Sequence, residues 1–270
     1  PLPTSFYIRF VEDDLLVEYE LEIDLGLFLD KDYSRKIVFE CLRINDKTIF
    51  ERNDKLEFFN LNSIEQYLIN NFSENEDSAK AIARNNLNKT ELFLTNGFKL
   101  MFSSKLVSFI SKWLIEKFIV IYRADITELR RKLDSTESGK IYISETTNEA
   151  AKLFGINSNA LGYVIPEDGA ESQLCSIFKD KNIAIPAEIF ESYGTIRFIK
   201  MFPLILKALT EGAVLVLDEF DANIHPMAVM NIINIFHNDD INKKNAQLIF
   251  NTHKPIFLNS NIVRRYESKF

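Results

Sequence analysis

The sequence lacks three features that would each place it in a special class of protein: a disulfide framework, a long apolar run and an excess of positive charge. Only Cys41 and Cys175 are cysteines, and they lie far apart without the spacing of a metal site. We therefore expect two buried thiols in a reducing compartment. No stretch approaches the roughly 20 apolar residues that span a bilayer, and no secretory signal opens the chain.

The net charge of −7 argues against a nucleic-acid surface that covers the whole chain, although it leaves room for a local basic patch. With 46% hydrophobic and 26% charged residues, the composition is that of an ordinary globular protein. We expect a cytoplasmic protein without membrane contact. A length of 270 residues allows one large domain or two small ones.

The first part of the chain, residues 1–55, has the pattern of a small antiparallel sheet. Segments 6–11 and 15–23 flank an acidic turn, and the second of them alternates between apolar and polar residues as a half-buried strand does. Segments 37–44 and 48–50 flank a second short turn, which predicts another hairpin.

The middle part, residues 56–190, is predicted to be a helical and irregular insertion lobe. Apolar residues at helical spacing predict helices near 64–68 and 106–114, whereas Asn, Ser and Glu residues at 70–78 indicate a loop. Residues 134–190 show no clear pattern beyond a short helix capped at Thr147-Asn148. Four aromatic residues at helical spacing are interpreted as core and not as a base-stacking surface: Phe102, Phe109, Trp113 and Phe118.

The last part, residues 191–270, alternates between helices and apolar strands. A helix from 193 to 210 should end at Gly212 and be kinked or broken at Pro203. The following elements are a strand at 213–217, a helix at 226–236 and a strand at 247–250. This alternation predicts a parallel sheet of the α/β class.

Asp218 and Glu219 directly follow the first of these two strands. Ligands of open α/β sheets bind beyond the carboxyl ends of the strands, so both carboxylates should face a ligand. One carboxylate can hold Mg²⁺ and the other can polarise a water for attack on a phosphate. A buried strand that ends in ordinary acidic turn residues is the alternative interpretation.

Two further segments complete the pattern. Asn251-Thr252-His253 follows the second strand, and an imidazole there can bond a phosphate oxygen, although a lone His is often structural. Ser192-Tyr193-Gly194-Thr195 opens the helix before the acidic strand, where free N–H groups and the helix dipole favour phosphate, although Ser is also a common helix cap.

The order and spacing of these segments resemble the heads of ABC-type and SMC-like ATPases, and more closely the bacterial AAA-family ATPases of the OLD and abortive-infection kind. The close match covers about residues 190–260. The resemblance implies a P-loop NTPase fold of the ABC type, with an antiparallel β subdomain and a helical insertion. It equates 192–195 with the signature motif, 214–219 with Walker B and 221–226 with the D-loop.

The resemblance also implies a role for each site residue. Asp218 would orient Mg²⁺, Glu219 would act as general base and His253 would sense the γ-phosphate. Ser192, Gly194 and Thr195 of the signature, with Asp221 and Asn223 of the D-loop, would bind ATP, the signature doing so on the opposed head. Two heads would dimerise around ATP and Mg²⁺ and control an effector protein, a nuclease or a toxin, in defence against phage.

The sequence departs from this family pattern because it contains no P-loop of the form G-x-x-x-x-G-K-[S/T]. The nearest segment, Ser138-Gly139-Lys140-Ile141, lacks the first glycine and ends in isoleucine. Since the chain begins at Pro1 without a methionine, we expect that a preceding P-loop was removed. A signature that reads Ser-Tyr-Gly-Thr, and not Ser-Gly-Gly-Gln, speaks against a transporter subunit.

Two other functions remain open on the sequence alone. A non-catalytic regulatory scaffold would keep the ATPase fold to hold a partner, and the missing P-loop favours it. A DEAD-box-like helicase fits the D-E-x-D pattern of residues 218–221, but Asn251-Thr252-His253 stands where helicases have Ser-Ala-Thr.

Overall fold

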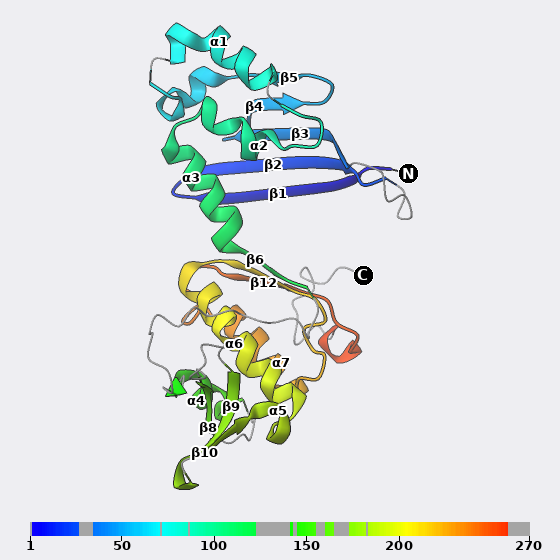
Figure 1. Ribbon diagram of the computed structural model, residues 1–270, viewed down its shortest axis with the longest axis vertical. Helices are drawn as coiled ribbons and strands as arrows, with labels where there is room; N and C mark the ends of the chain where they lie inside the picture. Colours follow the sequence, from blue (N-terminus) through cyan, green and yellow to red (C-terminus); the bar gives the residue numbers. More distant parts are fainter. Residues whose placement is uncertain are drawn as a thin grey trace. The chain divides into compact units, whose positions relative to one another are not determined.

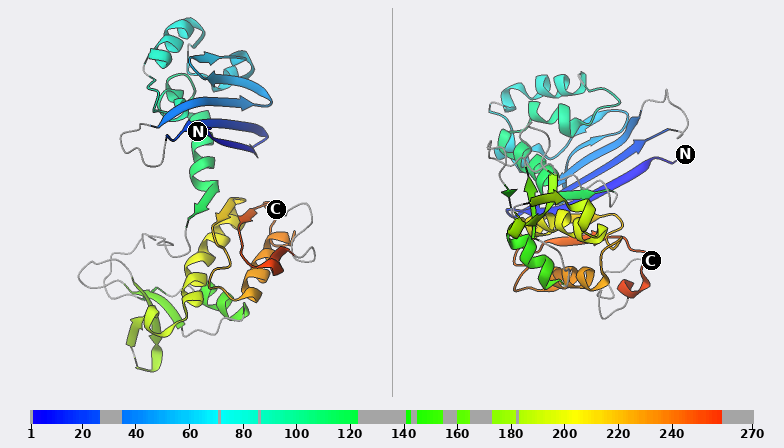
Figure 2. Two further views of the ribbon diagram at one scale, coloured as in Figure 1. Left: turned by 90° about the vertical axis from the view of Figure 1, so that its right-hand side faces the viewer. Right: turned by 60° about the horizontal axis from the view of Figure 1, so that its bottom comes forward.

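The chain forms two compact units, Pro1–Lys112 and Trp113–Phe270. The division falls within the segment 56–190 that the sequence analysis treats as one lobe. Figures 1 and 2 show the two units as ribbons from three directions. The computed structural model describes residues 2–26, 35–70, 72–85, 87–122, 141–142, 145–154, 160–164, 173–181 and 183–258.

The first unit is built on a five-stranded antiparallel sheet in which the strands follow one another in chain order (Figure 1). Both predicted hairpins are confirmed. The turn residues have positive φ angles, of 47° at Asp13 and 62° at Asp14 in the first hairpin and of 49° at Asn45 and 61° at Asp46 in the second. Short polar residues tolerate this conformation, which suits the right-handed twist of the strands. The strands are β1 (Thr4–Glu12), β2 (Leu15–Asp24), β3 (Lys36–Ile44), β4 (Lys47–Arg52) and β5 (Leu56–Phe58).

Helices complete the first unit: η1 (Leu61–Tyr67), α1 (Phe72–Asn85), α2 (Phe93–Asn96), η2 (Phe98–Leu100) and α3 (Ser104–Lys112). The predicted loop at 70–78 is wrong, since α1 begins at Phe72. The polar residues Asn75, Asp77 and Ser78 lie on the solvated side of this helix, whereas Phe72, Ala79 and Ala83 are buried. The predicted helix at 106–114 is α3, which ends at Lys112, and the chain continues through a π turn, η3 (Trp113–Lys117).

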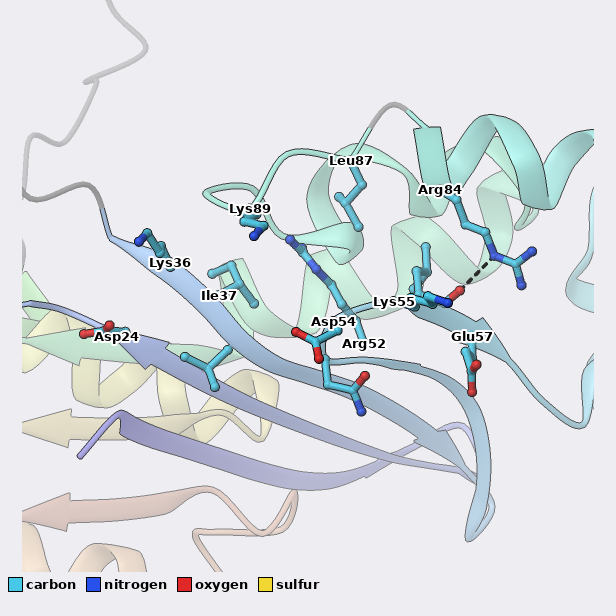
Figure 3. A pocket seen from close by; sticks show the side chains of 13 residues that line it. Asp24, Lys36, Ile37, Arg52, Asp54, Lys55, Glu57, Arg84, Leu87 and Lys89 are labelled. Carbon is cyan, nitrogen blue, oxygen red and sulfur yellow. Dashed lines mark hydrogen bonds between the residues drawn. The ribbon is translucent and has the colours of Figure 1, made fainter. Parts of the chain in front are cut away.

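A cavity of about 650 Å³ lies in the first unit between β3, the β4–β5 turn and the end of α1 (Figure 3). Its arginines bind backbone carbonyl groups of its wall. Arg84 donates from Nε to the carbonyl of Leu56 at 2.9 Å, and Arg52 donates to the carbonyls of Asn88 and Glu91. The two bonds of Arg52 hold the loop before α2 against the sheet, and the bond of Arg84 joins the end of α1 to β5.

The second unit contains a three-stranded parallel sheet in the order β12-β11-β6, formed by β6 (Phe118–Ile121), β11 (Val214–Leu217) and β12 (Gln247–Phe250). The predicted parallel pairing of the two C-terminal strands is confirmed, whereas β6 was not predicted and lies in the segment assigned to the helical and irregular lobe. β6 consists of Phe118-Ile119-Val120-Ile121, which suits a strand, and it pairs with β11 residue for residue.

Two helices pack against this parallel sheet and share one apolar core with it: α6 (Tyr193–Glu211) and α7 (Pro226–His237). The predicted end of α6 at Gly212 is confirmed, with a φ of 67° at that glycine. α6 runs through Pro203 without a break, so of the two outcomes predicted there, a kink or a break, the break is excluded. Burial of the neighbouring residues Phe202 and Leu204 offsets the roughly 3 kcal/mol that a proline costs inside a helix.

The predicted irregular stretch at 134–190 contains regular structure where the chain is described. Its antiparallel sheet has the order β10-β9-β8-β7, from β7 (Ile141–Tyr142), β8 (Ala160–Val164), β9 (Gln173–Phe178) and β10 (Ile183–Pro186). The helices are α4 (Glu145–Leu153), η4 (Lys179–Lys181) and α5 (Ala187–Phe190), with η5 (Pro255–Leu258) after β12. Thr147-Asn148 lies inside α4 instead of capping it. Ser138-Gly139-Lys140 lies outside the described residues.

Both cysteines are buried and unpaired, as expected. Burial raises the pKa of the Cys41 thiol to about 11 and also raises the pKa of Cys175. Within the part of the chain that the structure describes, no helix combines the length and the apolar character needed to cross a bilayer.

The buried carboxylate of Glu40 joins the sheet of the first unit to α2. It accepts hydrogen bonds from the Tyr19 hydroxyl at 3.0 Å and from the backbone N–H groups of Phe93 and Leu94 at 2.8 and 2.9 Å, and it lies 3.6 Å from Arg52. Two carboxylate oxygens are needed for this set, since all of the groups around them are donors.

Replacing Glu40 by glutamine should therefore destabilise the protein. The amide NH₂ would face a donor and leave it unsatisfied, at a cost of about 2–4 kcal/mol in the free energy of unfolding. Urea denaturation followed by circular dichroism measures this change. The same replacement at the exposed Glu57 should change the free energy by less than about 0.5 kcal/mol; equal effects at both positions would contradict the role of Glu40.

Candidate functional site

The carboxyl ends of β6, β11 and β12 meet at one edge of the parallel sheet. Asp218 directly follows β11, and its N–H donates to the carbonyl of Ile121 at the end of β6, at 3.1 Å. Asn251 directly follows β12, which pairs with β11 in parallel so that Leu217 lies opposite Phe250. The register thus places the first residue after each strand at the same level.

Asn251 connects the two acidic residues. Its Nδ2 donates to Oδ1 of Asp218, and its Oδ1 accepts from the backbone N–H of Glu219. No role for Asn251 was predicted from the sequence. Its side chain has both a donor and an acceptor and directly follows β12, the strand that precedes His253 in the sequence, and this was the signal that could have found it.

The side chains of Glu219 and His253 approach each other at the solvent edge of the site. Oε1 of Glu219 lies 4.0 Å from Nε2 of His253, and the two side chains are 49% and 87% exposed. An ion pair forms only when the imidazole is protonated. Glu219 also has a positive φ of 49°, a conformation that is uncommon for a residue with a Cβ atom.

The loop between β11 and α7 contains Asp221 and Asn223, which differ in exposure. The carboxylate of Asp221 is buried, with Oδ2 3.9 Å from Nζ of Lys254, and Lys254 also donates to the carbonyl of Asp221 at 3.1 Å. Asn223 is exposed and has a φ of 59°. Lys254, which the sequence analysis missed, therefore holds Asp221 inside the loop. The predicted helix start at Pro226 is confirmed, with His225 as its N-cap.

Ser192 caps α6. Its Oγ accepts from the N–H of Thr195 at 3.1 Å and lies 2.8 Å from the Thr195 hydroxyl. Thr195 is buried, so its hydroxyl and N–H both serve the cap. Ser192 itself is exposed, as is the neighbouring Tyr193.

The start of α6 touches the loop that follows β11. A Cβ atom on Gly194 would lie 2.0 Å from the backbone oxygen of Asn223, so no larger residue fits without moving one of the two segments. One turn further along α6, Arg197 donates from Nη1 to the carbonyl of Ala222 at 2.7 Å and from Nη2 to that of Glu219 at 2.6 Å. Arg197 is buried and was not predicted from the sequence.

All eight residues predicted for the site lie in the second unit, and contacts join them in two groups. Asn251 joins Asp218 to Glu219 at the strand ends, and Glu219 lies 4.0 Å from His253. Ser192, Gly194 and Thr195 at the start of α6 meet the loop that contains Asp221 and Asn223. Arg197 joins the two groups through Glu219.

Mg²⁺ prefers carboxylate, water and phosphate oxygens as ligands, and Asp218 supplies a carboxylate directly after β11. Among the described residues, no three or more His, Cys, Asp or Glu side chains form a cluster that could hold a metal by themselves. A single carboxylate such as that of Asp218 can supply one ligand of a Mg²⁺ ion whose other ligands are water and the phosphates of a nucleotide.

Residues 1–259 match the model of the protein family described as "AAA domain, putative AbiEii toxin, Type IV TA system". This match covers far more than half of the chain. A comparison with curated proteins finds none that matches.

Replacing Gly194 by alanine should destabilise the second unit, because the new methyl group would collide with a backbone oxygen. We expect a cost of about 1–3 kcal/mol in the free energy of unfolding, measured by urea denaturation. The neighbouring Tyr193, whose side chain is 55% exposed, provides the control. If Tyr193→Ala costs as much as Gly194→Ala, then the close approach to Asn223 is not what limits this position.

Proposed function

Because the chain belongs to this family of AAA domains, which are P-loop NTPases and generally ATPases, we propose that its second unit contains half of an ATPase site of the ABC and SMC-like type. The observation that carries the proposal is the group at the strand ends: Asp218 and Glu219 joined by Asn251, with His253 at 4.0 Å from Glu219. In this proposal the chain supplies the Mg²⁺-binding, general-base and signature groups of a site that binds and hydrolyses ATP.

Each residue takes a role that its surroundings suit. Asp218 holds Mg²⁺, which neutralises charge on the phosphates when bound. Glu219 takes the proton of the attacking water, and its half-exposed carboxylate has room for that water. His253 donates to a γ-phosphate oxygen, since its imidazole is exposed beside Glu219.

The exposed Ser192 and the backbone of Gly194 bind the γ-phosphate of an ATP molecule held by a second head, at the positive end of the α6 dipole. Thr195 supports them through the cap, and Asp221 and Asn223 form the loop beside them. Two heads then close around ATP and Mg²⁺. The family description links the chain to toxin–antitoxin systems, so the output we propose is control of an effector protein, a nuclease or a toxin, in defence against phage.

A non-catalytic scaffold is the second candidate, and the observation that favours it is the absence of G-x-x-x-x-G-K-[S/T] from the sequence. The first experiment compares ATP binding and turnover by the protein as encoded with those of the 270-residue chain. Turnover by the encoded protein alone supports an ATPase whose P-loop lies outside these residues. Nucleotide binding by neither protein supports the scaffold.

Replacing Glu219 by glutamine should abolish turnover while leaving ATP binding intact. Loss of a general base lowers the rate by about 10²- to 10⁴-fold, and the ATP-bound dimer should accumulate. Phosphate release and light scattering in the presence of ATP and Mg²⁺ measure the two effects. Glu188→Gln, at an exposed position of α5, is the control. An unchanged rate in Glu219→Gln would favour the scaffold.

Replacing Ser192 by arginine should prevent dimerisation without unfolding the protein. The long cationic side chain would occupy the space that the opposed phosphate needs, whereas the exposed position tolerates it in the monomer. Sedimentation with ATP and Mg²⁺ measures dimerisation, and a thermal melt tests the fold. Thr210→Arg, near the other end of α6, should dimerise normally; normal dimerisation of Ser192→Arg would contradict the two-head arrangement.

A further inference from the structure

We infer that Arg197 is a positioning residue that fixes the backbone of Glu219 and couples it to the start of α6. The positional part of this inference rests on contacts within the second unit. Its catalytic consequence rests on the proposed function.

The peptide groups of Glu219 are held from two sides by elements far apart in the chain. Its N–H donates to Oδ1 of Asn251 after β12, and its carbonyl accepts from Nη2 of Arg197 in α6. The same carbonyl also accepts from the N–H of Ala222, which closes a turn over residues 219–222. Arg197 binds the carbonyl of Ala222 as well, so one guanidinium group clamps both ends of this turn.

This clamp acts on a residue whose backbone is in an unfavourable conformation. A positive φ at a residue other than glycine costs on the order of 1–3 kcal/mol and persists only where the surroundings fix it. Without Arg197, the carbonyl of Glu219 keeps only the bond within its own turn. The direction of the Glu219 side chain would then be less well defined.

Arginine suits this position better than lysine. The two carbonyl oxygens lie on residues three apart, and the planar fork of the guanidinium reaches both with separate nitrogens at 2.7 and 2.6 Å. A lysine has a single nitrogen on a more flexible stem and cannot make the same pair of bonds. Because Arg197 is buried, water cannot freely replace a hydrogen bond that is lost there, and the loss costs free energy.

Arg197 lies one helical turn after Gly194, which touches Asn223 at the other end of the same loop. The start of α6 and the loop from Glu219 to Asn223 are therefore connected at two points. Under the proposed function, the start of α6 binds the nucleotide of the opposed head while Glu219 acts on the nucleotide of its own head. A displacement of α6 on dimerisation would thus reach Glu219 through Arg197.

The test uses Arg197→Lys in the encoded protein, with Arg52→Lys as matched control. Arg52 makes the same kind of clamp, on Asn88 and Glu91 in the first unit. Hydrogen exchange of the Glu219 and Ala222 amides should accelerate by about tenfold or more in Arg197→Lys, whereas Arg52→Lys should leave them unchanged. The kcat for ATP should fall by about 10²-fold in Arg197→Lys alone, with KM within about threefold, since misplacement of a catalytic group acts on the chemical step.

Unchanged exchange at Glu219 and Ala222 in Arg197→Lys would overturn the inference, whatever the ATPase activity. An equal fall of kcat in Arg52→Lys would overturn its catalytic part. If the wild-type protein neither binds nor hydrolyses ATP, the proposed function fails, but the exchange measurement still decides the positioning role. If Arg197→Lys does not fold, hydrogen exchange in the wild-type protein tests the positioning role instead. Exchange of the Ala222 amide as fast as that of the exposed Asn223 amide would show that the turn is not clamped.

Discussion

The parallel register of three short strands determines where every group of the candidate site lies. Val214–Leu217 of β11 pairs residue for residue with β6 on one side and β12 on the other. Because all three strands point the same way, the residues that follow them meet at one edge, where their side chains find partners across the sheet. A slip of one residue would turn each strand's other face to the core and separate Asn251 from Asp218.

Backbone carbonyl groups that leave regular structure need donors, and this protein supplies them with arginine in both units. Arg52 bridges the carbonyls of Asn88 and Glu91, and Arg197 bridges those of Glu219 and Ala222. In each pair the carbonyls are three residues apart, a spacing that the guanidinium fork can span. The same kind of clamp therefore fixes one loop in each unit. What distinguishes Arg197 is that its loop contains Glu219.

Local patterns made part of this structure predictable. The hairpins of the first unit and the helix from Tyr193 to Gly212 follow from alternation, turn residues and a C-terminal glycine, which act within a few residues. The strand β6 was missed because its four apolar residues directly follow a helical pattern, and only pairing with β11 makes them a strand. Asn251, Arg197 and Lys254 were missed for a related reason: their partners lie 22–33 residues away, and register decides which groups meet.

Burial in the folded chain separates the residues that can carry chemistry from those that support them. Thr195 and Asp221 are buried and bonded within the protein, to Ser192 and Lys254, so they shape the site without facing solvent. Ser192, Glu219 and His253 are exposed and can meet a ligand. A sequence motif cannot separate the exposed residues from the buried ones, because spacing alone does not report burial. In the folded chain, the site residues that are open to solvent include a hydroxyl, a carboxylate and an imidazole, and these are groups that phosphate chemistry uses.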